Sequence, residues 1–318
     1  MNKVPDKAAI DVAANRIQHF IHKTPILTSR ILNEATGANL FLKCENLQKA
    51  GAFKSRGAVN ALFSLSEIEL KKGVCTHSSG NHAAALARAA ALRNTKAYIV
   101  MPENSPTVKV DAVKYYGGQI SFCAPNLAAR ESTLKTIQLE TGAIEIHPYN
   151  NFTIIAGQAT AAREIFLQLD MEPDFIIAPV GGGGLLSGTA LSANYFSGKT
   201  KVIAAEPKGA DDAYRSFKAG EIIPSENPVT IADGLLTSLG SKTFPIIMEH
   251  VHRIFTVEEH SIVKAMKFIW ERMKIVIEPS SAVAVAAVFE NKAYFEHTNT
   301  ALIISGGNCD LNKLPWLT

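Results

Sequence analysis

The stretch that decides the fold is DFIIAPVGGGGLLSGTALSANYF, residues 174–196. An apolar run is followed by four glycines and then by a longer apolar segment, a pattern typical of a buried strand, a turn and a helix. Consecutive glycines let backbone N–H groups converge without Cβ atoms in the way, and the start of a helix carries partial positive charge. The stretch therefore predicts a phosphate-binding turn in an α/β fold, with a flexible hinge as the alternative.

The glycine run, Gly181, Gly182, Gly183 and Gly184, does not form a GxGxxG pattern. No Lys-Ser or Lys-Thr pair follows it either, so it is not the loop of a nucleoside triphosphatase. A dinucleotide or a nucleoside triphosphate is therefore not the expected ligand of this turn.

Outward from this stretch, short apolar runs alternate with helical segments along the whole chain. Examples of the apolar runs are LFLKC (40–44), AYIVM (97–101) and ALIIS (301–305). Such alternation predicts a two-lobed, doubly wound α/β architecture with mostly parallel sheets. The polar turn around 148–152 is the best lobe boundary, so we expect a small domain over 73–150 within a large domain formed by 1–72 and 151–318.

The composition favours a globular protein that binds small molecules. Of the 318 residues, 47% are hydrophobic, and the 32 basic and 29 acidic residues are interspersed, which gives no nucleic-acid-binding face. The four cysteines form no CxxC pair, as expected in a reducing compartment. The N-terminus has no apolar signal region, and no apolar run reaches the roughly 18 residues of a membrane span. We expect a soluble, cytoplasmic protein.

Two segments carry side chains suited to ligand chemistry. In KAGAFKSRGAVNAL, Lys54 follows Phe53 at the expected start of a helix. A lysine there is usually a solvated charge, but a desolvated amine beside an aromatic ring can condense with an aldehyde. In THSSGNH (76–82), hydroxyl and amide groups precede an alanine-rich helix, which suits a bound carboxylate or ordinary helix capping.

Two further candidates follow predicted strands. Ser305 ends ALIIS and is either a turn residue or a ligand at the carboxyl ends of the strands, where open α/β sheets bind their ligands. In AAEPKGADDAY, Glu206, Asp211 and Asp212 form either a solvated acidic turn or a site for a hard cation such as Mg²⁺ or Ca²⁺.

Taken together and in order, AFKSRGA, SSGNHAAALA, PVGGGGLLSG, AAEPKGADD, TIADG, IEPS and ISGGN resemble the serine racemase and serine/threonine dehydratase family. The resemblance covers nearly the whole chain. It implies the tryptophan-synthase-β-like fold of pyridoxal-phosphate enzymes (fold type II), with pyridoxal 5'-phosphate as cofactor and a homodimer as assembly.

The resemblance also assigns residues. It implies a cofactor site formed by Phe53, Lys54, Asn81, Gly181, Gly182, Gly183, Gly184 and Ser305. Lys54 is the residue that bonds the cofactor, Asn81 lies at its 3-hydroxyl and Ser305 faces its pyridine nitrogen. It implies a substrate site formed by Ser78, Ser79, Gly80, Asn81, His82, Arg130 and Gly234. In racemases of this group the serine matching Ser79 is the acid/base opposite the lysine.

The acidic cluster matches the divalent-cation site of the family, which implies Mg²⁺, Ca²⁺ or Mn²⁺ held by Glu206, the Ala210 carbonyl and Asp212. Positions that bind ATP in animal serine racemase match at Tyr116, Lys274 and Asn308. Polar residues expected there are replaced by Arg30, Ala50 and Ala84, so ATP activation is not expected.

The expected activity is an ammonia-lyase (dehydratase) reaction that converts L-serine or L-threonine to a 2-oxo acid and ammonia, with serine racemisation as a second outcome. Tyr149 and Asn150 resemble the dehydratase version of their loop, which favours this interpretation. Arg130 either is an ordinary surface arginine on a helix or corresponds to an arginine of racemases and hydroxyaspartate dehydratases, so racemisation proper and 3-hydroxyaspartate dehydration are the alternatives. A β-replacement synthase and a non-catalytic amino-acid-binding module are less favoured.

Overall fold

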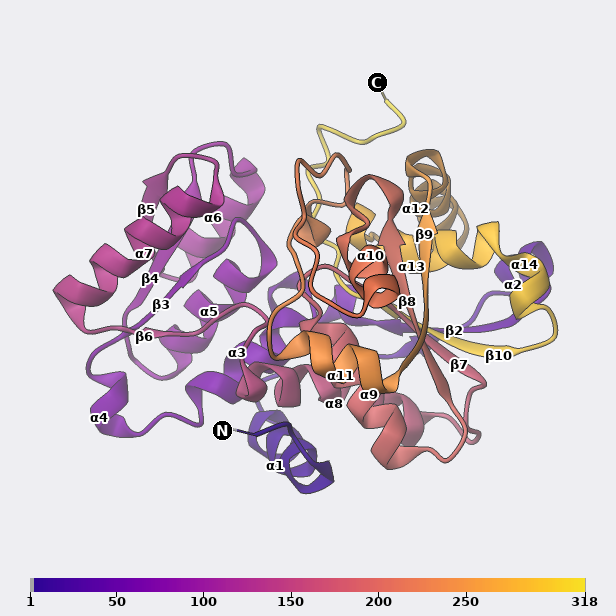
Figure 1. Ribbon diagram of the computed structural model, residues 1–318, viewed down its shortest axis with the longest axis horizontal. Coiled ribbons are helices and arrows are strands. Elements are labelled where there is room, and N and C mark those ends of the chain that lie inside the picture. Colours follow the sequence, from indigo (N-terminus) through magenta and orange to yellow (C-terminus); the bar gives the residue numbers. More distant parts are fainter. Residues whose placement is uncertain (1–2, 318) are drawn as a thin grey trace.

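The structure is a computed structural model that describes residues 3–317. Two lobes lie side by side, each with its own sheet (Figure 1). The strands of the larger sheet are β1 (Ile26–Leu27), β2 (Asn39–Cys44), β7 (Phe175–Pro179), β8 (Lys201–Pro207), β9 (Val251–Val257) and β10 (Asn299–Ile304). They lie in the order β1-β2-β10-β7-β8-β9, and neighbours are parallel except for β1 and β2.

The smaller sheet consists of β3 (Val74–His77), β4 (Ala97–Pro102), β5 (Gln119–Cys123) and β6 (Ile144–Glu145). These strands lie in the order β5-β4-β3-β6 and are all parallel. The predicted α/β fold with mostly parallel sheets is therefore confirmed.

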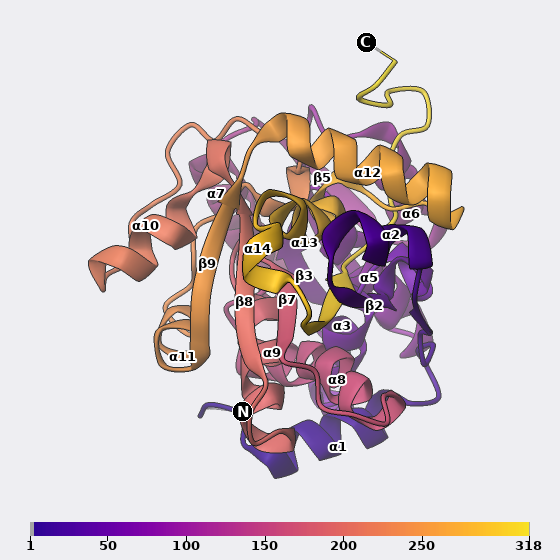
Figure 2. The same cartoon turned by 90° about the vertical axis from the view of Figure 1, so that its right-hand side faces the viewer.

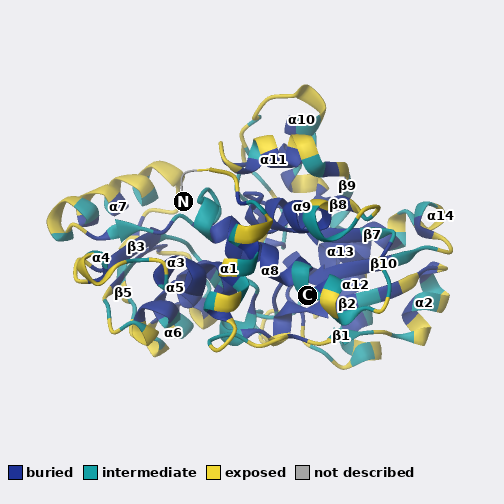
Figure 3. Ribbon diagram, turned by 90° about the horizontal axis from the view of Figure 1, so that it is seen from below, coloured by how far each residue is buried: buried dark blue, intermediate teal, exposed yellow. Residues whose placement is uncertain are grey.

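Helices cover both faces of the larger sheet (Figure 2). On one face lie α8 (Phe152–Gln168) and α9 (Gly184–Phe196), with α1 (Lys7–Ile17) packed on their outer side, and on the other lie α12 (Glu259–Met273) and α13 (Pro279–Glu290). Because successive strand residues point to opposite faces, Ile176 packs with Leu186 of α9 while Ile177 packs with Val283 of α13. The central strands are accordingly buried along most of their length (Figure 3).

The other α-helices are α2 (Arg30–Thr36), α3 (Lys54–Leu62), α4 (Glu67–Leu70), α5 (Asn81–Leu92), α6 (Thr107–Tyr115), α7 (Leu127–Thr141), α10 (Asp212–Ala219), α11 (Thr243–His250) and α14 (Lys292–Phe295). Short 3₁₀ helices are η1 (Glu45–Leu47), η2 (Lys49–Gly51), η3 (Lys208–Ala210) and η4 (Asp233–Leu235). Among the helices of residues 3–317, none combines the length and apolarity that crossing a membrane requires.

Helix α3 packs on both lobes. It lies against α8 of the larger lobe and against α5 of the smaller one. Its Val59 and Leu62 share a hydrophobic cluster with Leu86 and Ile99 of the smaller lobe. The division of the chain at residues 73 and 150 stays a prediction, although all strands of the smaller sheet fall between those positions.

Candidate active site

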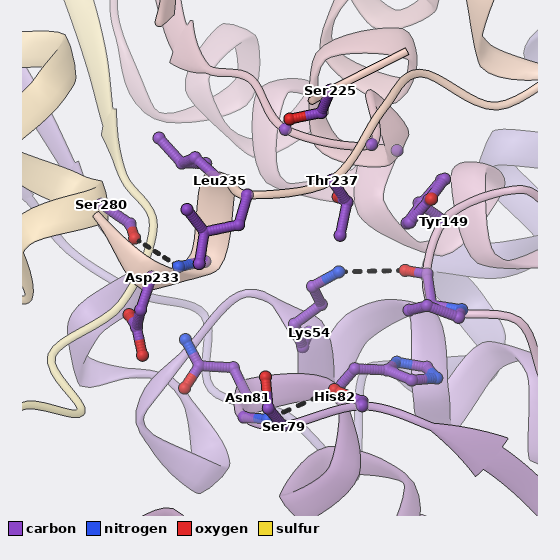
Figure 4. A pocket seen from close by; sticks show the side chains of 18 of the residues that line it. Lys54, Ser79, Asn81, His82, Tyr149, Ser225, Asp233, Leu235, Thr237 and Ser280 are labelled. Carbon is purple, nitrogen blue, oxygen red and sulfur yellow. Dashed lines mark hydrogen bonds between the residues drawn. The ribbon is translucent and has the colours of Figure 1, made fainter. Parts of the chain in front are cut away.

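A cavity of about 450 Å³ lies between the lobes and is lined by residues from both. Figure 4 shows Lys54 reaching into it, with Ser79 and Asn81 on one side and Thr237 on the other. The predicted cofactor and substrate residues all line this cavity: Phe53, Lys54, Ser78, Ser79, Gly80, Asn81, His82, Arg130, Gly181, Gly182, Gly183, Gly184, Gly234 and Ser305. The fold thus brings together positions that are far apart in the sequence, and their individual roles stay predictions.

Lys54 is the first residue of α3, and the turn of η2 precedes it in the chain. Its Nζ donates a hydrogen bond to the Pro148 carbonyl at 2.9 Å and lies 5.2 Å from the centre of the Phe53 ring. Burial lowers the pKa of Lys54 to about 8, although the negative charge of Glu278 opposes the shift. The amine is therefore much more easily deprotonated than a solvated lysine, which makes it available as a nucleophile.

The glycine run forms a tight turn before α9. Gly183 has a φ of 86°, which side chains with a Cβ rarely adopt. A Cβ on Gly182 would lie 2.4 Å from ring atoms of Tyr149, and one on Gly181 would lie 2.9 Å from the Leu235 Cα. Because the first N–H groups of a helix have no partner within the helix, this turn and the start of α9, which border the cavity, are suited to binding an anion.

A second helix begins at the cavity with α5. Its N-cap is Gly80, and no side chain caps the helix, so ordinary capping by Ser79 or Asn81 does not explain the polar turn. Gly80 N instead donates to Ser78 Oγ at 3.3 Å. Two helix N-termini thus border one cavity, an arrangement suited to a ligand with two separate anionic groups.

His82 is directed toward the protein interior. It is 1% exposed, and its Nε2 lies 2.9 Å from the Ile146 carbonyl, to which it donates. Burial lowers the pKa of His82 to about 3, so the ring is neutral. Its ring nitrogens are therefore not placed to carry a proton to a ligand, and its contribution at the cavity is the backbone at the start of α5.

Ser305 lies at the end of β10 and is 3% exposed. Its Oγ is 3.0 Å from Ser281 Oγ. Ser281 Oγ in turn donates to the Gly306 carbonyl at 2.6 Å and accepts from Gly306 N at 2.7 Å. Ser281 was not singled out from the sequence, because a serine inside an apolar helix gives no sign of its partners.

Arg130 lies on α7, at the side of the cavity formed by the smaller lobe. Among the described residues no group accepts a hydrogen bond from its buried Nε atom. A guanidinium with a free donor beside a cavity is suited to bidentate pairing with a carboxylate.

The acidic cluster lies outside the residues that line the cavity. Glu206 is the second-to-last residue of β8, and its carboxylate accepts hydrogen bonds from Ala213 N and Tyr214 N, both at 2.8 Å. Asp212 is 1% exposed, and within residues 3–317 neither of its carboxylate oxygens has a partner. Burial raises the pKa of Glu206 to about 9 and that of Asp212 to about 6.

These two carboxylates fit a hard cation. Buried carboxylates without an opposite charge are costly, and oxygen atoms are the ligands that Mg²⁺ and Ca²⁺ prefer. The unpartnered Asp212 oxygens supply such ligands, and Ala210 in η3 places its backbone between the two acids. The predicted donor set is therefore chemically suited to the ion.

A further group of candidate ligand atoms was not anticipated from the sequence. His77, Glu145 and His147 have ligand atoms within 4.8 Å of one another, because β3 and β6 are neighbours in the smaller sheet. His147 Nδ1 accepts hydrogen bonds from Tyr149 N at 3.3 Å and Asn150 N at 2.9 Å. The proton of the neutral ring is therefore on Nε2, which makes this atom a hydrogen-bond donor and poorly suited to a metal ion.

Comparison with known proteins identifies the family of the chain. Residues 17–306 match the model of the family described as pyridoxal-phosphate dependent enzyme. A beta-hydroxyaspartate dehydratase of Paracoccus denitrificans (strain Pd 1222) is 50% identical over 98% of this chain and 99% of the relative. The crystal structure of serine racemase from Dictyostelium discoideum has a TM-score of 0.91 and 51% identity, and covers 96% of this chain and 99% of that one.

The crystal structure of a threonine deaminase from T.th. is also similar. Its TM-score is 0.92 and its sequence is 41% identical, over 96% of this chain and 99% of that one. The similar proteins thus include one named a racemase, one named a dehydratase and one named a deaminase, and each similarity extends over nearly the whole chain.

Proposed function

The chain belongs to the family of pyridoxal-phosphate dependent enzymes, and we propose that it acts on small β-hydroxy amino acids as an ammonia-lyase. L-Serine or L-threonine would give a 2-oxo acid and ammonia, with racemisation of serine as a second outcome. The observation that carries the proposal is the Lys54 amine, buried in a cavity that two helix N-termini border. One helix start suits the phosphate of the cofactor and the other suits the carboxylate of the substrate.

We propose a separate role for each group of residues that lines the cavity. Gly181 to Gly184 and the start of α9 would bind the cofactor phosphate, and Phe53 and Asn81 would border its ring. The bound cofactor supplies an electron sink that makes the proton on the substrate Cα removable. The Lys54 amine would be the base that takes this proton. Its lowered pKa, about 8, keeps a useful fraction of the amine neutral near pH 7.

The substrate turn determines orientation and outcome. Backbone N–H groups of 78–81 at the start of α5 would receive the substrate carboxylate, with Gly234, which also lines the cavity, nearby. We assign Ser79 as the acid/base of the racemase branch, because its side chain lines the cavity together with Lys54. A proton returned by Lys54 preserves the configuration at Cα, whereas a proton from Ser79 inverts it.

We propose a structural Mg²⁺ at Glu206, the Ala210 carbonyl and Asp212, supported by the buried, unpartnered Asp212 oxygens. The ion would compensate the charge of this acidic turn away from the cavity, so its effect would be on stability and on the position of α10. We expect a homodimer from the resemblance. We expect a cytoplasmic location because the cysteines form no CxxC pair.

A second candidate function is dehydration of 3-hydroxyaspartate. The free Nε donor of Arg130 beside the cavity favours it, because a guanidinium can pair with a second, β-carboxylate group of the substrate. The similarity to a beta-hydroxyaspartate dehydratase supports the same assignment. L-Serine has no such group, so Arg130 separates the two candidates.

The experiment is a substrate panel with the holoenzyme. Release of 2-oxo acid and formation of the opposite enantiomer are measured with L-serine, D-serine, L-threonine and the 3-hydroxyaspartates, with Lys54→Ala as the inactive control. We expect pyruvate and 2-oxobutyrate as main products. The second function would be assigned instead if the enzyme formed oxaloacetate from 3-hydroxyaspartate and Arg130→Gln lowered that activity by about tenfold or more without changing serine turnover. Absence of turnover on the whole panel would refute both.

A further inference from the structure

Both ends of the Asn81 side-chain amide are engaged by the protein. Its Nδ2 donates to Glu278 Oε1 at 2.8 Å and to Oε2 at 3.0 Å, while its Oδ1 accepts from Asn308 Nδ2 at 2.9 Å. Burial raises the pKa of Glu278 to about 7, and above that pH its ionised carboxylate can only accept, whereas an amide NH₂ group can only donate. With Glu278 ionised, one of the two orientations that the Asn81 amide could take satisfies both partners and the other satisfies neither.

The two partners are themselves fixed. Asn308 Nδ2 also donates to the Ala50 carbonyl at 2.8 Å, and a backbone carbonyl can only accept, so the Asn308 amide cannot turn over without losing both bonds. Glu278 is 2% exposed at the N-cap of α13, and its backbone N donates to the Gly306 carbonyl at 3.0 Å. A Cβ on Gly306 would lie 2.6 Å from Glu278 Oε1, so the carboxylate is closely packed on that side as well.

We propose that Glu278 is a positioning residue for the cofactor, acting through Asn81. Together with Asn308 it sets the Asn81 amide so that Nδ2, and not Oδ1, is the atom offered to the 3-oxygen of pyridoxal phosphate. The inference rests on the proposed function, which places Asn81 beside that oxygen. Nδ2 has two hydrogens. One of them, directed between the two oxygens of Glu278, can make both of those bonds, and the other is left for the cofactor. An N–H directed at an oxygen with negative charge stabilises it, whereas an amide oxygen in the same place would repel it.

A second effect of Glu278 must be separated from this one. Its negative charge also acts on the Lys54 amine, where it opposes the effect of burial. Lys109 and Asp233, which form an ion pair with each other, are the other charged groups that act on Glu278. Glu278→Gln removes the charge but keeps an oxygen that can accept from Asn81, whereas Glu278→Leu removes both. The two variants therefore distinguish orientation from charge.

The test uses the enzyme stripped of cofactor and reloaded with pyridoxal phosphate. Two quantities are measured: the dissociation constant of the cofactor, and the ratio of the visible to the near-ultraviolet absorption band of the bound form, which reports hydrogen bonding at the 3-oxygen. The variants are Glu278→Gln, Glu278→Leu, Asn81→Ala and the double variant. Glu290→Gln, at the other end of α13, is the matched control, because within residues 3–317 its carboxylate accepts a hydrogen bond from Glu258 N and none from Asn81.

We expect Glu278→Gln and the control to keep the dissociation constant within about threefold of the unchanged enzyme, and Glu278→Leu to raise it about tenfold or more and to change the band ratio. If Glu278 acts through Asn81, the double variant should be no worse than Asn81→Ala alone. If Glu278→Leu does not fold, Asn308→Ala replaces it, since it frees the other end of the same amide and should change the band ratio in the same direction.

Four outcomes would overturn the inference. Loss of affinity in Glu278→Gln equal to that in Glu278→Leu would show that charge on Lys54 is the main effect. If adding Glu278→Leu to Asn81→Ala lowered the cofactor affinity by as much as Glu278→Leu does alone, Glu278 would not act through Asn81. If Asn81→Ala altered the spectrum and Glu278→Leu did not, only the role of Glu278 would be refuted. If Asn81→Ala had no effect, the proposed place of Asn81 beside the cofactor would be refuted.

Discussion

Arg56 and Glu45 form a bidentate ion pair in the interior of the protein, with Nε and one terminal nitrogen of Arg56 each 2.7 Å from a different Glu45 oxygen. Neither side chain is exposed, and Arg56 also pairs with Glu164 of α8 at 2.8 Å. Arg56 lies two residues after Lys54 on α3. The ion pair thus joins α3, the helix that carries Lys54, to η1. The contact of Arg56 with Glu164 joins the same helix to α8.

Replacement of Arg56 should therefore cost much stability. In Arg56→Met the buried Glu45 carboxylate loses its main compensating charge, and we expect the free energy of unfolding to fall by about 3 to 5 kcal/mol. Urea unfolding of the cofactor-free protein, followed by circular dichroism, measures it. The control is Arg93→Met, because Arg93 pairs with the exposed Glu67 and such pairs contribute about 1 kcal/mol or less. Equal effects of the two replacements would contradict this prediction.

The pH dependence of cofactor attachment should follow the Lys54 amine. Only the neutral amine attacks the aldehyde, and the pKa of Lys54 is lowered to about 8 by burial. The attachment rate should therefore rise about tenfold per pH unit below the pKa and level off above it. Growth of visible absorption after mixing cofactor-free protein with pyridoxal phosphate gives the rate, and Lys54→Ala should give no such signal. A rate that still rises steeply near pH 10 would indicate a lysine with an ordinary pKa.

Ser79→Ala should separate racemisation from elimination. Loss of the acid/base group should slow interconversion of the serine enantiomers about a hundredfold or more, since a positioned proton donor contributes at least that much. Pyruvate release from L-serine needs only the proton transfer by Lys54 and should change by a few-fold at most. Both products are measured in the same reaction mixture. Parallel loss of the two activities would contradict the assignment of two separate bases.

Magnesium should stabilise the protein through Asp212. Binding to the folded state alone raises stability by about 2.7 kcal/mol at a hundred times the dissociation constant. We expect the melting temperature to rise with Mg²⁺ in the unchanged protein and in Asp211→Asn, and not in Asp212→Asn. Asp211 is a suitable control, because its carboxylate pairs with Arg215 Nε at 2.8 Å and is not among the proposed ligands. A magnesium effect that survives in Asp212→Asn would place the ion elsewhere.

The sequence located much of the site because of how parallel sheets are built. Lys54, the turn before α5, the glycine run and Ser305 each follow an apolar run or precede a helix, and such positions gather at the carboxyl ends of the strands. Local patterns therefore marked these positions as candidates, although each of them alone also had an ordinary structural explanation. The resemblance added the expected partners of each position.

What the sequence could not provide is the set of contacts between distant segments. Glu278 and Asn81 are 197 positions apart, and Asn308 and Asn81 are 227 apart, so no local pattern joins them. A glutamate before an apolar helix is ordinarily read as a solvated N-terminal acid, and only the packing of the loops around Gly306 shows that Glu278 is buried. The packing of α3 on both lobes depends on tertiary structure in the same way.

The position of β10 in the larger sheet affects how the protein can be made. This last strand pairs with β2 on one side and β7 on the other, so the six-stranded sheet stays in two separate pieces until residue 304 has been synthesised. On the ribosome, β2 can pair early with β1, but its second partner is translated some 260 residues later. Ser305 follows directly, and a nascent chain therefore cannot assemble the complete cofactor pocket before nearly all of it has been translated. Interrupted translation should yield fragments that expose unpaired strand edges and need chaperones or proteases to deal with them.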